Sequence, residues 1–83
     1  MILAVDIGNS NIVLGGVEGN DIRFEARLRT DATKTSDEYC IDLKMILEVY
    51  EANPKAVEGA IISSVVPQVM NSIKTALKKL TGK

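Results

Sequence analysis

The chain opens with two short apolar runs that are separated by a tight polar turn. Residues 2–7 and 11–17 are rich in aliphatic and β-branched side chains, which favour strands. The intervening Gly8-Asn9-Ser10 consists of residues that tolerate the unusual backbone angles of a hairpin turn. Because a strand that turns so tightly returns antiparallel beside itself, this stretch predicts a β-hairpin.

A third run, residues 21–28, extends the hairpin to an antiparallel meander. It follows a turn signal at residues 18–21, and its side chains alternate between charged and apolar. One face carries Arg23, Glu25 and Arg27, and the other carries Ile22, Phe24, Ala26 and Leu28. A period of two predicts a half-exposed strand at the edge of a sheet. Residues 2–7 are apolar almost throughout, so we expect a central strand covered on both faces.

Helical spacing replaces this period after residue 34. Thr35 and Glu38 have the spacing of a capping box, in which each side chain satisfies a free N–H of the first turn. One apolar face then recurs at Tyr39, Leu43, Ile46, Leu47 and Tyr50. Asn53-Pro54 is expected to stop this helix, because proline disfavours a helical residue before it.

The end of the chain predicts a buried strand and a second helix. Residues 58–66 form a near-continuous apolar run, expected to lie parallel to the first strand, and Pro67 suits the first position of a helix. Lys78, Lys79 and Lys83 suit the negative end of that helix. Its narrow apolar stripe is Val66, Met70, Ile73, Leu77 and Leu80. Three strands, a helix, a strand and a helix make an α/β fold.

Composition excludes several classes of function. Hydrophobic residues make up 46% of the 83 residues and charged residues 25%, with a net charge of -1, so nothing indicates a nucleic-acid or anionic-membrane partner. No segment is long and apolar enough to cross a bilayer, and the start has no signal-peptide pattern. The single Cys40 has no partner for an intrachain disulfide and is expected to be a small buried hydrophobe. We therefore expect a cytoplasmic protein.

The acid at the end of the first run suggests chemistry. A carboxylate followed by a small-residue turn between strands can hold the phosphates of a nucleotide. The N–H groups of the turn and the Ser10 hydroxyl would donate to phosphate oxygens, while Asp6 faces a hydrated Mg²⁺. On spacing alone, a structural hairpin fits equally well, with Asp6 bonded back to the N–H of Gly8 or Asn9.

Four stretches resemble one family, in the same order along the chain. Residues 6–11 resemble the Asp-x-Gly-Asn-Thr/Ser-Asn phosphate motif of the type III pantothenate kinases, members of the actin-like, sugar-kinase-like ATPase superfamily. Residues 27–31 resemble the exit of that family's third strand, and residues 35–39 the entry of its first helix. Residues 61–67 match its Ser-Ser-Val-Val-Pro junction between strand and helix.

The resemblance implies an actin-like, ribonuclease H-like half-domain with strand order 3-2-1-4. The family's order is 3-2-1-4-5 in a much longer chain of two domains. Residues 1–83 would then be the truncated N-terminal part of the first domain, without the final strand or the second domain. The strand at 58–66 would have an unpaired apolar edge, through which the fragment is expected to self-associate.

The implied function is ATP-dependent phosphorylation of pantothenate to 4'-phosphopantothenate, the first step of coenzyme A biosynthesis, with Mg²⁺ and a monovalent cation such as K⁺. The resemblance assigns phosphate binding to Asp6, Ile7, Gly8, Asn9, Ser10, Asn11, Ile12 and Val13, and Asp6 would meet Mg²⁺ through a bound water. Ser10 stands where the family usually has Thr. The general base, the pantothenate-binding Gly-x-Asp-Arg segment and the carboxylate for the monovalent cation would lie beyond residue 83. The fragment alone is therefore expected to be inactive, and the full-length protein to be a homodimer.

Other interpretations stay open at this stage. Ser63 and Ser64 can line the site or cap the second helix. Arg29, Thr30 and Asp31 can reach the cleft or a dimer partner, although a solvated loop fits them better. The chain can also be a non-catalytic nucleotide-binding or transcriptional accessory module of the superfamily, or a member that phosphorylates another acceptor.

Overall fold

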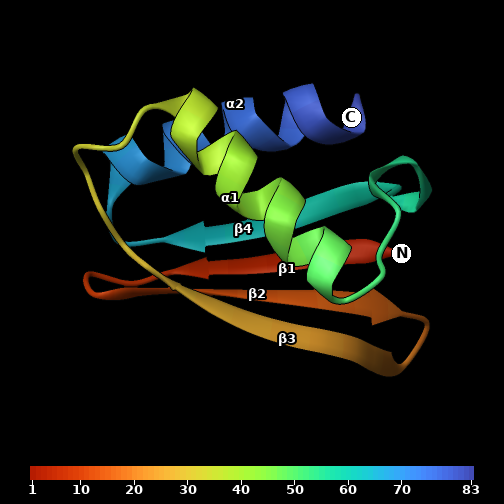
Figure 1. Cartoon of the computed structure of the whole chain (residues 1–83). Helices are drawn as coiled ribbons and strands as arrows, with labels where there is room; N and C mark the ends of the chain where they lie inside the picture. Colours follow the sequence, from red (N-terminus) through yellow and green to blue (C-terminus); the bar gives the residue numbers. More distant parts are fainter.

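A four-stranded sheet with both helices packed on one face forms the molecule (Figure 1). The computed structural model describes residues 1–83. The strands are β1 (Ile2–Ile7), β2 (Asn11–Glu18), β3 (Asp21–Arg29) and β4 (Gly59–Ser64). The helices are α1 (Ser36–Val49) and α2 (Pro67–Thr81), and a short 3₁₀ turn, η1 (Pro54–Ala56), precedes β4.

The sheet has the predicted order. It runs β3-β2-β1-β4, with β1 antiparallel to β2, β2 antiparallel to β3, and β1 parallel to β4. The predicted α/β class and the meander of the first three strands are therefore confirmed. In the parallel pair, Asp6 lies opposite Ser63 and Ile7 lies opposite Ser64.

The sheet is buried on one face only, which corrects two predictions. In β1, Leu3, Val5 and Ile7 are buried against the helices, whereas Ala4 and Asp6 are exposed. The strand is therefore central but not covered on both faces. The predicted buried strand at 58–66 is the shorter β4, in which Ile61 is 69% exposed. Both differences arise because α1 and α2 share one face and β4 lies at the edge of the sheet.

A bulge changes the predicted faces of β3. Phe24 pairs with Gly16, but Ile22 pairs with Val17, so Arg23 is an extra residue on the β3 side. The alternation is thereby reset, and Ile22 is 68% exposed on the open face of the sheet instead of packing beside Phe24. Phe24 and Ala26 are buried as predicted, and Leu28 is half-buried.

The first helix begins as predicted and ends earlier. Thr35 and Glu38 form the complete capping box. The buried face contains Tyr39, Leu43 and Leu47, with Ile46 half-buried and Tyr50 stacked on Phe24 at a ring-centroid distance of 5.1 Å. The helix stops at Val49, so Asn53-Pro54 does not end it; the proline instead begins η1, whose first free N–H is bonded to the Asn53 side chain.

The second helix begins at Pro67 as predicted, and Gly82 ends it in the left-handed conformation at φ 76°. Its buried face is centred between Ile73 and Leu77, with Val69, Ala76 and Thr81 beside them. The other predicted stripe residues, Val66, Met70 and Leu80, are only half-buried. Neither helix is long and apolar enough to span a membrane. Cys40 is a half-buried free thiol packed against the core.

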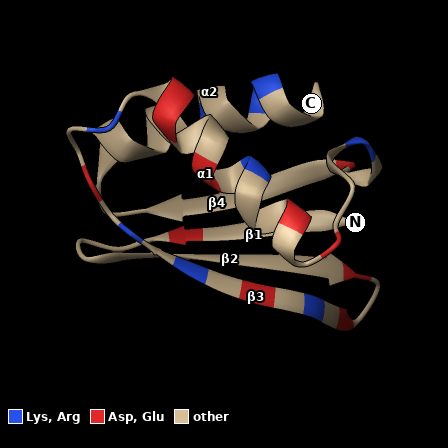
Figure 2. Ribbon diagram, in the orientation of Figure 1, with Lys and Arg blue, Asp and Glu red and all other residues tan.

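Charged side chains of both signs occur on α1 and β3, whereas α2 carries only lysines and β4 has no charged residue (Figure 2). One ion pair connects the two helices: Lys79 Nζ of α2 donates to Asp37 Oδ1 of α1 at 2.7 Å. Another, Lys34 Nζ to Asp42 Oδ2 at 2.6 Å, ties the connection before α1 to the helix itself. The ion pair between Lys79 and Asp37 thus joins two helices that are distant in the sequence.

Gly16 is the glycine with the least space for a side chain. A Cβ there would lie 2.7 Å from Phe24 Cδ1, and the stacked Tyr50 restricts the movement of that ring. We expect Gly16→Ala to lower the free energy of unfolding by about 1–3 kcal/mol through overpacking. The control is Gly15→Ala, whose Cβ would have no neighbour closer than 3.8 Å. Urea denaturation measures both; equal effects of the two substitutions would contradict the explanation.

The ion pair between the helices predicts a pH dependence. The bond from Lys79 holds the pKa of Asp37 below its ordinary value of 3.8. The contribution of this ion pair to the free energy of unfolding is therefore present above about pH 3.8. It is lost as the pH falls through the lowered pKa of Asp37 in the folded state. Asp37→Asn should slightly lower the free energy of unfolding at neutral pH and not at all in strong acid. Glu48→Gln, on the same helix and outside any ion pair, is the control in urea denaturation across this pH range.

Candidate functional site

Chemistry-bearing residues gather at one end of the sheet. The carboxyl ends of β1, β3 and β4 and the amino ends of α1 and α2 all lie there (Figure 1). Helix amino ends carry partial positive charge and favour anions. Asp37 and Glu38 in the first turn of α1 offset that charge, whereas the first turn of α2 has no acidic residue. This end of the molecule therefore has the polarity of an anion site.

Gly8, Asn9 and Ser10 connect β1 to β2 and form, with Asn11, what we call the elbow. The Gly8 N–H donates to the Asn11 carbonyl at 2.9 Å and closes it. None of these residues has a positive φ, so the turn does not need the unusual backbone angles that the sequence suggested. Gly8 instead relieves a close contact, because a Cβ would lie 3.3 Å from the Asn11 carbonyl oxygen.

The elbow presents donors to solvent. Asn9, Ser10 and Asn11 are exposed, and the backbone N–H groups of Asn9 and Ser10 donate to no carbonyl of the chain. The carbonyls of Gly8, Ser10 and Asn11, in contrast, all accept bonds from the protein. An arrangement with occupied carbonyls and available N–H groups suits the oxygens of a phosphate.

Asp6 stands beside the elbow as an exposed carboxylate. It is not the turn acid of the structural alternative, because the Gly8 N–H bonds to Asn11 and the Asn9 N–H has no carboxylate partner. Its side chain accepts a hydrogen bond across the parallel pair, where Ser63 Oγ donates to Asp6 Oδ1 at 3.3 Å. The chain contains no cluster of three or more potential metal-ligating side chains. A single free carboxylate fits Mg²⁺ that is held mainly by phosphate and water.

Two predicted phosphate-binding residues have side chains in the core. Ile7 and Ile12 are 0% exposed, and the Ile7 carbonyl already accepts from the Val65 N–H at 3.1 Å. Any contact of Ile7 or Ile12 with a nucleotide would therefore involve the backbone. Val13 is half-buried, pairs with Asp6 and lies with it on the open face of the sheet.

The two serines at the end of β4 have different environments. Ser63 is exposed and paired with Asp6, so it lies at the candidate site. Ser64 Oγ instead accepts from the Val66 N–H at 2.9 Å and forms the turn into α2. It is not the N-cap of that helix, since the N-cap is Val66, which has no side-chain cap bond.

The exit of β3 is tied to the elbow. Thr30 Oγ1 donates to the Gly8 carbonyl at 2.8 Å, and the Thr30 N–H donates to the Ser10 carbonyl at 2.9 Å. The next residue, Asp31, is held by the Tyr39 hydroxyl, which accepts from its N–H at 2.9 Å and donates to its carbonyl at 2.8 Å. The solvated loop that the sequence favoured for residues 29–31 is thus an ordered connection.

Tyr39 is the residue whose role the sequence did not reveal. Its spacing places it on the apolar face of α1, and its ring is indeed fully buried. The available signal was chemical: a buried tyrosine needs a partner for its hydroxyl, and the polar residues nearby are those before the helix. Within this connection, the hydroxyl and N–H of Thr33 bond to the Asp31 carboxylate and lower the pKa of Asp31 below its ordinary value.

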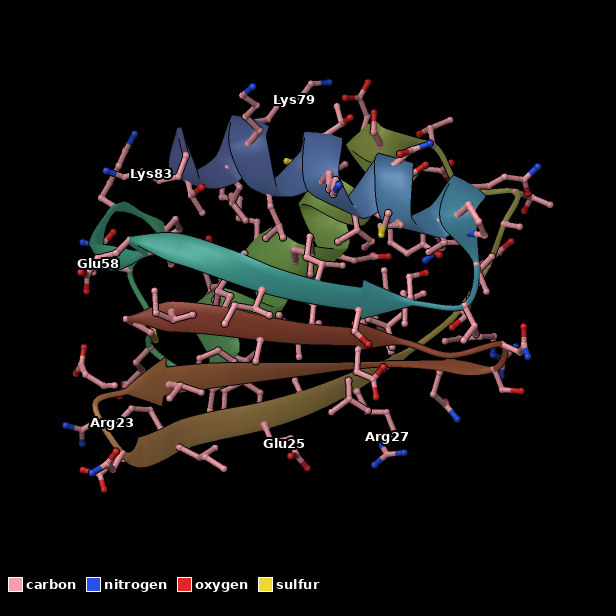
Figure 3. All side chains as sticks on the ribbon, turned by 180° about the vertical axis from the view of Figure 1, so that it is seen from behind. Arg23, Glu25, Arg27, Glu58, Lys79 and Lys83 are labelled. Atoms are coloured by element: carbon pink, nitrogen blue, oxygen red, sulfur yellow. The ribbon has the colours of Figure 1, made fainter.

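The open face of the sheet is hollowed next to Asp6. The hollow has a volume of about 320 Å³ and is apolar over most of its length, with Val17, Ile22 and Ile61 among the lining residues and Asp6 and Ser63 at one end. Figure 3 views the sheet with α1 behind it, and Glu25 and Arg27 project from β3 at its margin. The polar end of the hollow is therefore continuous with the elbow.

Known proteins of one family are similar to this chain in sequence. A family model described as type III pantothenate kinase matches residues 2–82. The chain belongs to the type III pantothenate kinase family. It is 46% identical over 82 residues to the type III pantothenate kinase of Finegoldia magna, and 46% identical over 82 residues to that of Bifidobacterium animalis subsp. lactis.

These alignments cover most of this chain and a minor part of the relatives. Each includes 99% of the chain but only 31% of the Finegoldia protein and 32% of the Bifidobacterium protein. The chain thus spans about a third of the length of the curated relatives it matches.

Proposed function

We propose that this chain supplies the ATP phosphate-binding part of a pantothenate kinase. The complete enzyme would transfer the γ-phosphoryl group of ATP to pantothenate and form 4'-phosphopantothenate, the first step of coenzyme A biosynthesis. The observation that carries the proposal is the elbow: available N–H groups at Asn9 and Ser10 stand beside the free carboxylate of Asp6. Membership of the family supplies the reaction class.

Phosphoryl transfer depends mainly on positioning and on neutralising charge. The N–H groups of Asn9 and Ser10 and the Ser10 hydroxyl would hold phosphate oxygens. The amino end of α2, whose first turn has no acidic residue, would favour the negative charge of the phosphates. Asp6 would hold Mg²⁺ through a bound water, and Ser63 would orient its carboxylate. The bound Mg²⁺ would supply charge neutralisation between the β- and γ-phosphates.

The remaining parts of the proposal rest on the resemblance. The general base, the pantothenate site and the ligands of K⁺ would be provided by the longer protein, beyond residue 83. We also propose that the longer protein is a homodimer and is located in the cytoplasm. The third of the enzyme described here would not catalyse the reaction by itself.

The test is a kinase assay on this chain and on a version extended to family length, with ATP, Mg²⁺, K⁺ and pantothenate. We expect activity only in the extended protein, where Asp6→Asn should lower kcat/KM by about 100-fold, as expected for loss of a group that stabilises the transition state. Asp21→Asn at the start of β3, at the other end of the sheet, is the control and should have no effect.

Each unexpected result has a definite meaning. An inactive extended protein would contradict the pantothenate kinase assignment. Equal activity of Asp6→Asn and the unmodified protein would remove Asp6 from the metal site. Turnover by the 83 residues alone would place the general base within this chain.

Self-association through the edge of β4 is a separate proposal. No residue of β4 is charged, whereas the edge strand β3 carries Arg23, Glu25 and Arg27, and charged residues are a common protection against edge pairing. We expect this chain to form concentration-dependent dimers that Ile61→Lys abolishes. Ile22→Lys, which changes an equally exposed isoleucine on β3, is the control. Sedimentation velocity measures both variants; dimers that persist in Ile61→Lys would contradict pairing through β4.

A further inference from the structure

The direction of a backbone N–H is fixed by the carbonyl that shares its peptide group. In a trans peptide these two bonds point in opposite directions. The Asn9 N–H shares its peptide with the Gly8 carbonyl, and the Asn11 N–H shares its peptide with the Ser10 carbonyl. Whatever bonds to the two carbonyls therefore determines where the N–H groups of Asn9 and Asn11 point.

One residue bonds to both carbonyls. Thr30 reaches the Gly8 carbonyl with its hydroxyl at 2.8 Å and the Ser10 carbonyl with its backbone N–H at 2.9 Å. Thr30 is half-buried and Asn9 is exposed, so the Gly8 carbonyl points into the protein and the Asn9 N–H points out of it. If the Gly8–Asn9 peptide turned over, a carbonyl oxygen would face the phosphate and repel it.

Thr30 is itself held in place from α1. The Tyr39 hydroxyl bonds to both backbone groups of Asp31, the residue that follows Thr30. Tyr39 is 0% exposed, and the capping box fixes the first turn of its helix. A continuous set of hydrogen bonds thus runs from the core of α1 through Asp31 and Thr30 to the elbow.

We propose that Thr30 is a positioning residue, which holds the Gly8–Asn9 peptide with its N–H toward the nucleotide phosphates, and that Tyr39 fixes Thr30 for this purpose. The inference rests on the proposed function, since it concerns the same phosphate site. It adds a specific prediction: loss of the Thr30 hydroxyl impairs the binding of ATP and leaves the binding of pantothenate unchanged.

The first experiment examines the elbow without any ligand. Backbone NMR relaxation of this chain is compared among the unmodified protein, Thr30→Val, Thr30→Ser and Thr75→Val. We expect the order parameter at Asn9 to fall in Thr30→Val from about 0.85, typical of rigid backbone, to below about 0.6. Thr30→Ser keeps the hydroxyl and should restore it. Thr75→Val removes a threonine hydroxyl that bonds only within α2, to the Asn71 carbonyl, and should have no effect.

Tyr39→Phe is a second variant for the case in which Thr30→Val does not fold. It removes the hydroxyl and keeps the buried ring, so it should preserve the fold while loosening Asp31 and, through it, the elbow. Should Thr30→Val unfold, this variant decides the first experiment. Unchanged order parameters at Asn9 in the folded variants would overturn the inference.

The second experiment measures the KM values of the extended kinase. Thr30→Val should raise KM for ATP about tenfold, the effect of losing one well-placed hydrogen bond, with KM for pantothenate unchanged and Thr30→Ser close to the unmodified enzyme. A looser elbow with an unchanged KM for ATP would reduce Thr30 to a structural role and overturn the inference. An inactive unmodified enzyme would instead overturn the proposed function, and the relaxation data would then decide the inference alone.

Discussion

The parallel pairing of β1 with β4 is the constraint on which the rest of the structure depends. Parallel neighbours cannot be joined by a short turn, so the chain between them must cross over, and it does so through β2, β3 and α1. The pairing sets Asp6 opposite Ser63 and starts α2 beside the elbow. Residues that are 57 positions apart thereby share one hydrogen bond, and the groups that we propose to bind phosphate gather at one end of the sheet.

Features that depend on neighbouring residues could be predicted from the sequence. The hairpin, the Thr35–Glu38 capping box and the start of α2 at Pro67 are local, and each is present. Features that depend on distant packing could not. Apolar composition in residues 2–7 indicates a central strand, but only the placement of both helices determines which face is covered. The reset alternation at Arg23 likewise depends on the pairing with β2. The end of α1 at Val49 is local, but Glu51 adopts the left-handed conformation there at φ 57°, which a glutamate does not signal in a sequence.

The residues of the candidate site also fall into these two groups, those that neighbouring residues reveal and those that depend on distant contacts. Asp6 and the elbow are recognisable because a carboxylate, a glycine and small polar residues are adjacent in the sequence. The contribution of Thr30 is not recognisable, since it approaches the elbow from the end of another strand, 22 residues from Gly8. Tyr39 was assigned to the right face of the right helix, yet helical periodicity describes its ring and says nothing about its hydroxyl.

Because the core lies on one face of the sheet, the stability of the fold and the adhesion of the molecule to other surfaces depend on different side chains. Side chains on the helix-covered face, such as Leu3 and Leu14, determine how strongly the chain folds. Side chains on the open face, such as Val17, Ile22 and Ile61, contribute little to that free energy and instead determine what the molecule adheres to. Solubility can therefore be engineered on this face with little loss of thermal stability.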